Sequence, residues 1–167
     1  MEGVIRGKAH VFGPNIDTDQ IYPGRYLELT EPEDIAAHVM EGADPDFVKN
    51  MAPGDIVVAS RNFGCGSSRE HAAITLKYAR VGAVVAESFA RIFFRNAINL
   101  GVPLMVCPGI ANRVSTGDEL EVDLARGKVR NLTKGEVYQG EGLADHILEI
   151  LQQGGIKPVF RRRLGIE

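Results

Sequence analysis

The sequence predicts a single α/β domain in which parallel strands are followed by an antiparallel meander. Short apolar runs typical of buried strands occur at residues 55–60, 83–86 and 102–106. Two segments with helical apolar spacing lie between them, one ending at Gly82 and one spanning residues 88–100. This alternation favours parallel strands, because each helix returns the chain to the same edge of the sheet.

Glycine and serine mark the expected ends of the helices. We expect Gly82 to end the first helix in a left-handed conformation, Ser88 to cap the second helix and Gly101 to end it. A closing helix is predicted at residues 143–153, with Gly154 directly beyond it.

The N-terminal part is expected to contain a strand, a polar turn and a short helix. Residues 4–12 partly alternate as a strand does, and residues 13–19 form a turn dense in Asp, Asn and Gly. We expect residues 20–23 to be extended and residues 33–40 to be helical, with Thr30 placed to cap that helix.

Two further segments complete the predicted fold. Residues 41–54 contain prolines, glycines and mixed charge, and we expect an irregular surface segment there. Glycine turns near Gly127 and Gly135 separate short apolar runs, which predicts an antiparallel meander. These runs begin at Leu120, Val129 and Val137.

Length and charge exclude several classes of function. A chain of 167 residues with 44% hydrophobic content is long enough for one domain, spanning residues 1–167. Its net charge of −3 gives no general attraction to nucleic acid or to anionic membranes. No apolar segment approaches the roughly 20 residues of a membrane span, and the N-terminus lacks a signal-peptide pattern. We therefore expect a cytoplasmic protein with no nucleic-acid or membrane partner.

Cysteine usage argues against a metal site or cluster held by this chain. Cys65 and Cys107 form neither a disulfide framework nor a Cys-x-x-Cys pair. Cys65 lies in a glycine-rich turn, where a small residue fits. We expect no metal and no cofactor bound by this chain alone.

The segment Asn62–His71 carries the strongest functional signal. It places two glycines, two serines and an arginine between a predicted strand and a predicted helix. Such a turn exposes backbone N–H groups at the positive end of a helix dipole, which favours an anion. Arg69 in the first helical turn would oppose that dipole, so we expect it to serve a bound carboxylate or phosphate.

A structural role competes for the two serines of this turn. Serine is a preferred N-cap residue, and Glu70 follows Ser67 by three residues, as in a capping box. On this interpretation Ser67 and Ser68 would only start the helix.

Three separated motifs identify a family. Residues 15–21 (NIDTDQI), 62–71 (NFGCGSSREH) and 87–96 (ESFARIFFRN) resemble, in the same order, the small subunits of 3-isopropylmalate dehydratase and homoaconitase. These subunits correspond to the mobile C-terminal domain of aconitase. The resemblance implies a swivelling three-layer β/β/α domain with a mixed, barrel-like sheet and flanking helices. It further implies a partner large subunit carrying a [4Fe–4S] cluster, with which this chain would act as a hydro-lyase of leucine biosynthesis.

The resemblance also assigns roles to individual residues. It implies that Ser67, as an alkoxide, removes a proton from the carbon beside a carboxylate, and that Ser68 and Arg69 hold the substrate carboxylate. Asp19 corresponds to an acid that helps to set protonation at the site, although an aspartate in such a turn also serves as a backbone-bonding acceptor. Arg91 matches the third motif, as does Arg95, but both would also suit ion pairs on a helix.

Substrate choice is expected in the loop after the Asp-Thr-Asp turn. In homoaconitase-like relatives an arginine follows the Tyr-Leu pair, whereas this chain has Glu28 there. A second carboxylate would be repelled by Glu28, while Leu27 or Leu29 would accept the apolar isopropyl group of 3-isopropylmalate. Arg25 remains an alternative clamp for a carboxylate.

Other functions stay open at this stage. The chain would also suit a homoaconitase or a 2,3-dimethylmalate or citraconate hydratase. A non-catalytic phosphate- or nucleotide-binding module would use the same glycine turn, but the dinucleotide fingerprint and a Gly-Lys-Ser/Thr ending are missing. A serine hydrolase is the weakest alternative, because Gly-x-Ser-x-Gly is missing too.

Overall fold

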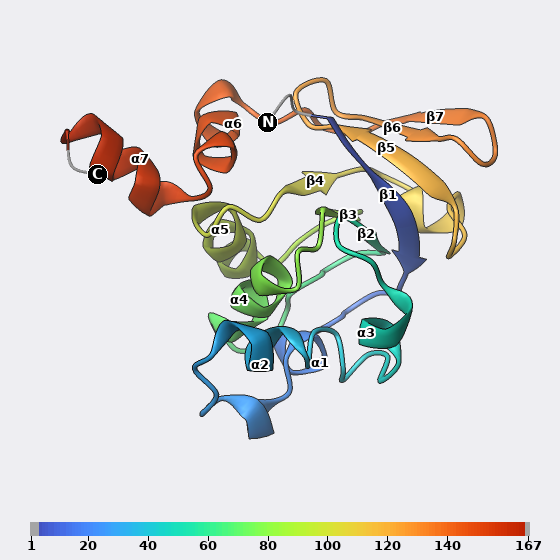
Figure 1. The fold of residues 1–167 in the computed structure, drawn as a ribbon. Helices are drawn as coiled ribbons and strands as arrows, with labels where there is room; N and C mark the ends of the chain where they lie inside the picture. Colours follow the sequence, from blue (N-terminus) through green and yellow to red (C-terminus); the bar gives the residue numbers. More distant parts are fainter. Residues whose placement is uncertain (1–3, 166–167) are drawn as a thin grey trace.

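The computed structural model describes residues 4–165, which form a mixed sheet flanked by helices (Figure 1). Seven strands in this range form one sheet in the order β4-β3-β2-β1-β5-β6-β7. The strands are β1 (Val4–Val11), β2 (Ile56–Ala59), β3 (Ala83–Ala86), β4 (Leu104–Val106), β5 (Glu119–Asp123), β6 (Lys128–Asn131) and β7 (Glu136–Gln139).

Strand β1 joins a parallel half of the sheet to an antiparallel half. On one side β1 pairs in parallel with β2, β2 with β3 and β3 with β4. On the other side β1 pairs antiparallel with β5, and β5 to β7 form the predicted meander. The prediction of a parallel core followed by a meander is confirmed.

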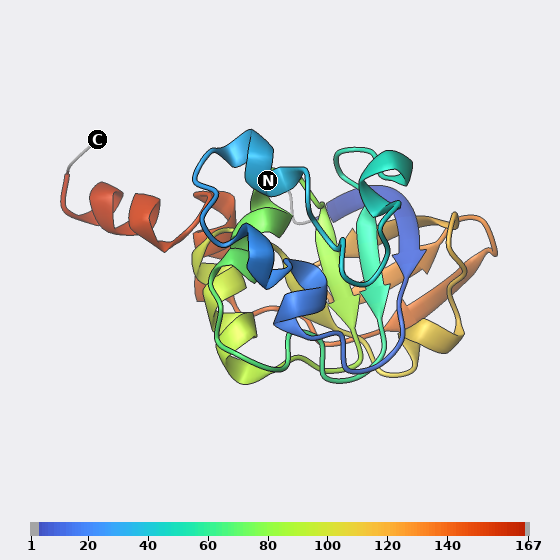
Figure 2. The same cartoon turned by 90° about the horizontal axis from the view of Figure 1, so that it is seen from below.

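Helices cover the parallel half of the sheet. Figures 1 and 2 show α4 and α5 on one side of β2 and β3, the meander on the other side, and α7 extending away from the body. The helices are α1 (Thr18–Ile21), α2 (Pro32–Ala36), α3 (Phe47–Asn50), α4 (His71–Tyr78), α5 (Arg91–Asn99), α6 (Asp145–Gln152) and α7 (Ile156–Arg163), with short 3₁₀ turns at Gly24–Tyr26 and Ile110–Asn112. Every residue of β2 and β3 is buried, as expected for strands covered on both faces.

Two N-terminal predictions were only partly right. Residues 20–23 are extended only at Tyr22 and Pro23, because Asp17 and Gln20 form a reciprocal capping box that starts α1, and this helix runs to Ile21. The predicted helix at 33–40 ends at Ala36, and its N-cap position is Glu31 rather than Thr30. The segment then turns, and Met40 takes a left-handed φ of 57°.

Three other segments are more ordered, or end differently, than predicted. Residues 41–54 contain α3, whose Phe47 is buried beneath the surface. The left-handed residue after α4 is Arg80, not Gly82, although Gly101 has the expected positive φ. Helix α7 was not predicted, and it carries the Arg161–Arg163 run.

A buried aspartate ties the sheet to the segment before β2. The Asp55 carboxylate accepts hydrogen bonds from the backbone N–H of Ala52 at 2.9 Å and of Lys8 at 3.2 Å, and it pairs with His10 at 2.8 Å. Its side chain is only 8% exposed. Burial raises the pKa of Asp55, but these hydrogen bonds outweigh burial and hold the pKa below its ordinary value.

We predict that Asp55→Ala lowers the free energy of unfolding by about 3 kcal/mol, because removing one partner leaves buried donors unpaired. A carboxylate with a lowered folded-state pKa stabilises the fold above its unfolded pKa, and this contribution is lost as pH falls through the folded value. Urea unfolding between pH 7 and pH 3 should therefore show a weaker acid dependence in the variant than in the wild type. An unchanged unfolding free energy at pH 7 would contradict this role for Asp55.

Candidate active site

The three motifs meet at one edge of the sheet. Each motif follows the carboxyl end of one of three neighbouring parallel strands: residues 15–21 follow β1, residues 62–71 follow β2 and residues 87–96 follow β3. In open α/β sheets this edge is where ligands bind. The topology thus gathers motifs that are far apart in sequence.

Backbone hydrogen bonds pair the first motif with the glycine turn. The Gly64 N–H donates to the Ile16 carbonyl at 2.7 Å, and the Thr18 N–H donates to the Cys65 carbonyl at 2.9 Å. The Asn62 side chain adds a hydrogen bond to Asn15 at 3.0 Å. Residues 15–18 and 62–65 therefore form one rigid unit, and Cys65 serves it through its backbone.

Gly64 allows α5 to pack against the turn. Its φ is 87°, and a Cβ added there would overlap the ring of Phe93. Phe63 packs edge-to-face on Phe93, with ring centroids 5.4 Å apart, and its carbonyl accepts the Ala90 N–H at 2.9 Å. The third motif is thereby fixed against the second.

Ser67 lies exposed at the end of this turn, beside Thr18, which was not predicted as a site residue. The Thr18 and Ser67 hydroxyl oxygens are 3.4 Å apart. Thr18 is buried, with 3% exposure. Its position between two aspartates in the first motif was the available signal, but only the folded chain shows that its hydroxyl reaches Ser67.

Asp19 and Arg69 form an ion pair next to the serines. Arg69 Nη1 donates to Asp19 Oδ1 at 3.1 Å and to the Tyr22 carbonyl at 3.0 Å. The Gly24 N–H donates to the same aspartate oxygen at 2.8 Å. The Gly24 hydrogen bond, followed by that of Arg69, holds the pKa of Asp19 below its ordinary value, so the carboxylate stays charged near neutral pH.

The helix-capping interpretation of the serines was wrong. Helix α4 begins only at His71, its N-cap position is Glu70, and no side chain caps it. His71 stacks on Tyr22, with ring centroids 5.6 Å apart, which packs the start of α4 against α1. Ser67 and Ser68 therefore precede the helix, as does Arg69, which is not in its first turn. Nor does Ser88 cap α5, since its Oγ accepts the Asn62 N–H at 2.8 Å.

A cavity of about 360 Å³ opens beside Ser67. The polar and charged residues that line it are Thr18, Ser67, Ser68, Arg69, Arg91 and Asn96. The other residues that line it are small or apolar: Gly64, Gly66, Ala90, Ile92 and Phe93. Its size and mixed lining suit a small organic acid.

The predicted specificity loop lies apart from this cavity. Leu27, Glu28 and Leu29 do not line it, and neither does Arg25. Arg25 lies over the Tyr26 ring, 4.7 Å from its centroid, and forms a long ion pair of 3.8 Å with Glu41. Their roles in substrate choice stay predictions.

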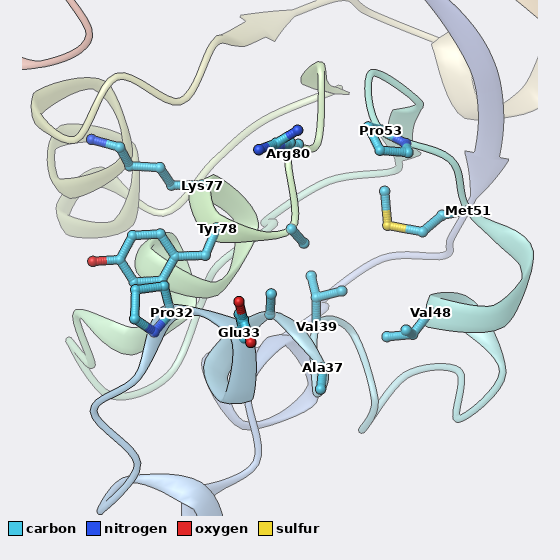
Figure 3. Close-up of a pocket in the computed structure, with 12 residues that line it drawn as sticks. Pro32, Glu33, Ala37, Val39, Val48, Met51, Pro53, Lys77, Tyr78 and Arg80 are labelled. Carbon is cyan, nitrogen blue, oxygen red and sulfur yellow. The ribbon is translucent and has the colours of Figure 1, made fainter.

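A larger cavity of about 670 Å³ lies between α2, α3 and α4 (Figure 3). Its lining is mainly apolar and includes Val39, Val48, Met51 and Tyr78. It contains no residue of the glycine turn, so we assign the chemistry to the smaller cavity.

Residues 4–165 contain neither a candidate metal site nor a helix that could span a membrane. No group of three or more His, Cys, Asp or Glu side chains in this range is placed to hold a metal ion. No helix there is both long and apolar enough to cross a membrane.

Comparisons with known proteins agree with this fold. Residues 34–107 match the model of the aconitase C-terminal domain. The chain is 54% identical to the isopropylmalate/citramalate isomerase small subunit of Methanocaldococcus jannaschii, covering 98% of each chain. It is 53% identical to the methanogen homoaconitase small subunit of Methanothermobacter thermautotrophicus, covering 93% of this chain and 90% of that one.

A solved structure leads to the same class. The crystal structure of a 3-isopropylmalate dehydratase from Methanocaldococcus jannaschii superposes with a TM-score of 0.91 at 42% identity, covering 96% of this chain and 95% of that one. Fold and motifs thus define an aconitase-type domain. The chain belongs to the family of 3-isopropylmalate dehydratase and homoaconitase small subunits.

We predict that Gly64→Ala destabilises the protein by about 2 kcal/mol or more, because it combines a strained backbone with overlap against Phe93. Gly13→Ala is the matched control, since a Cβ there meets nothing within 4 Å. Urea unfolding of both variants provides the measurement. Equal stability of the two variants would contradict the proposed packing.

Proposed function

We propose that this chain is the small subunit of a heteromeric hydro-lyase that converts 2-isopropylmalate into 3-isopropylmalate by dehydration and rehydration, in leucine biosynthesis in the cytoplasm. The observation that carries the chemistry is the pairing of the first motif with the glycine turn, which brings Thr18 to Ser67 and Asp19 to Arg69. The names of the relatives support the substrate class.

Ser67 is the proposed base. Its alkoxide takes the proton from the carbon next to a substrate carboxylate and becomes a hydroxyl, and the electrons of that C–H bond form a double bond to the neighbouring carbon. The hydroxyl group on the neighbouring carbon leaves with its bonding electrons and takes up a proton to become water. Rehydration adds water back across the double bond with the positions of hydrogen and hydroxyl exchanged. A serine hydroxyl is a poor base, so nearby groups must stabilise the charged oxygen. The Thr18 hydroxyl at 3.4 Å is placed to donate to it.

Arg69 and Ser68 are the proposed carboxylate contacts. A guanidinium has five N–H donors, and the two bonds to Asp19 and Tyr22 leave it able to bind a carboxylate as well. The ion pair with Asp19 orients Arg69 and keeps the guanidinium charge of Arg69 beside the cavity.

An iron–sulfur cluster does not fit the residues of this chain. Cluster ligands are thiolates, but burial raises the pKa of the Cys107 thiol to about 11, and Cys65 is the only other cysteine. By family resemblance we place a [4Fe–4S] cluster in the partner large subunit, where it would supply Lewis-acid chemistry toward the leaving hydroxyl.

A second candidate is the homoaconitase reaction, because one relative at 53% identity carries that name. Glu28, at the position where homoaconitase-like relatives have an arginine, favours the isopropyl substrate. A 2,3-dimethylmalate or citraconate hydratase would fit the same apolar preference.

The test of the base is Ser67→Ala in the complex reconstituted anaerobically with the large subunit. We expect turnover of 2-isopropylmalate to fall by at least about a thousandfold, because the proton acceptor is lost, while assembly of the complex is unchanged. Ser60→Ala, outside the cavity, is the control and should keep full activity. Near-normal turnover by Ser67→Ala would rule out this base.

For Thr18 we predict an effect on the pH profile. Thr18→Val removes a donor to the alkoxide, so the pKa of Ser67 should rise. The part of the pH profile in which kcat increases with pH should therefore move to higher pH by about one unit. Thr18→Ser should restore the wild-type profile. If Thr18→Val lowered activity equally at every pH, Thr18 would have only a structural role.

A further inference from the structure

Ile92 is an apolar residue left exposed inside the candidate site. It lies in the first turn of α5 and is 54% exposed. It lines the same cavity as Ser67. Exposing such a side chain costs free energy that burial against a ligand would recover.

The neighbours of Ile92 hold it at a fixed place relative to the base. Phe93 is 4% exposed and packs against Gly64, and the Ala90 N–H donates to the Phe63 carbonyl. The first turn of α5 is thereby attached to the turn that carries Ser67.

The remaining walls of the cavity define the kind of ligand. Arg69 and Arg91 place positive charge around it, and Ser67 and Ser68 add hydroxyls. Ala90 and Ile92 form an apolar wall. A small carboxylic acid with one alkyl substituent matches both parts.

We propose that Ile92, with Ala90, forms the subsite for the alkyl substituent of the substrate and is a specificity-determining residue of this chain. This inference rests on the proposed function. It differs from the expectation that Leu27 or Leu29 accepts the alkyl group, because those residues do not line the cavity. The ligand class is a hydroxydicarboxylate with a branched alkyl group.

The test compares two ligands that differ only in the alkyl group. The reconstituted complex carrying Ile92→Ala or Ile92→Val is assayed with 2-isopropylmalate and with its methyl analogue citramalate, used as substrate or as competitive inhibitor. Because methylene contacts in a hydrophobic pocket change selectivity by about 10- to 200-fold, we expect kcat/KM for 2-isopropylmalate to fall at least about tenfold in Ile92→Ala. Citramalate should change by less than about threefold, since its methyl group buries less apolar surface. Ile92→Val should be intermediate.

Val137→Ala is the matched control, because Val137 is 58% exposed on β7, outside the cavity. It should leave both ligands unaffected. An equal loss for both ligands, or no loss for either, would overturn the alkyl subsite. Weaker assembly with the large subunit would overturn it too, because Ile92 would then be a partner contact. A wild-type complex that is well assembled but inactive would instead refute the proposed function.

Discussion

The backbone pairing between residues 15–18 and residues 62–65 is the constraint on which the site depends. It joins the segments after β1 and β2 through hydrogen bonds between main-chain groups. Leaving such groups buried and unpaired would cost free energy. Gly64 permits this pairing while α5 packs on the same turn. Because the backbone is held in this way, Ser67 is displayed without serving as a helix cap. A proposed base that follows directly on such a fixed turn would lose little conformational freedom when substrate binds.

The site has the character of one half of a larger site. Ser67, Ser68 and the cavity wall at Ile92 are exposed, while Thr18 beneath them is buried. In the proposed function the charged groups attract and orient a carboxylate. Arg69 is fixed by Asp19, which the Gly24 N–H holds in turn, and by the Tyr22 carbonyl. Polar groups of this strength act best when water is excluded. A partner that covers the exposed face would provide that exclusion, which agrees with membership of a small-subunit family.

Much of the fold was readable from local patterns, but the side-chain geometry of the site was not. Buried strands and the meander follow from short apolar runs between glycine turns, and these predictions were confirmed. Helix α1 was missed because residues 20–23, which end at Pro23, were predicted to be extended. The capping box between Asp17 and Gln20 starts a helix there instead. The capping role of Ser67 was wrong because α4 begins only at His71, where the ring stacks on Tyr22 in a long-range contact that no local pattern predicts. Likewise, the approach of Thr18 to Ser67 joins residues 49 positions apart, which no local pattern encodes.

The central claim is that this chain presents Ser67 to the substrate in a site completed by its partner. The most direct test is a crystal structure of the reconstituted complex with 2-isopropylmalate bound. We expect Ser67 Oγ to lie about 3 Å from the carbon whose proton is removed, with Arg69 on a substrate carboxylate. A substrate bound in the assembled site with Ser67 turned away, and another side chain against that carbon, would contradict it.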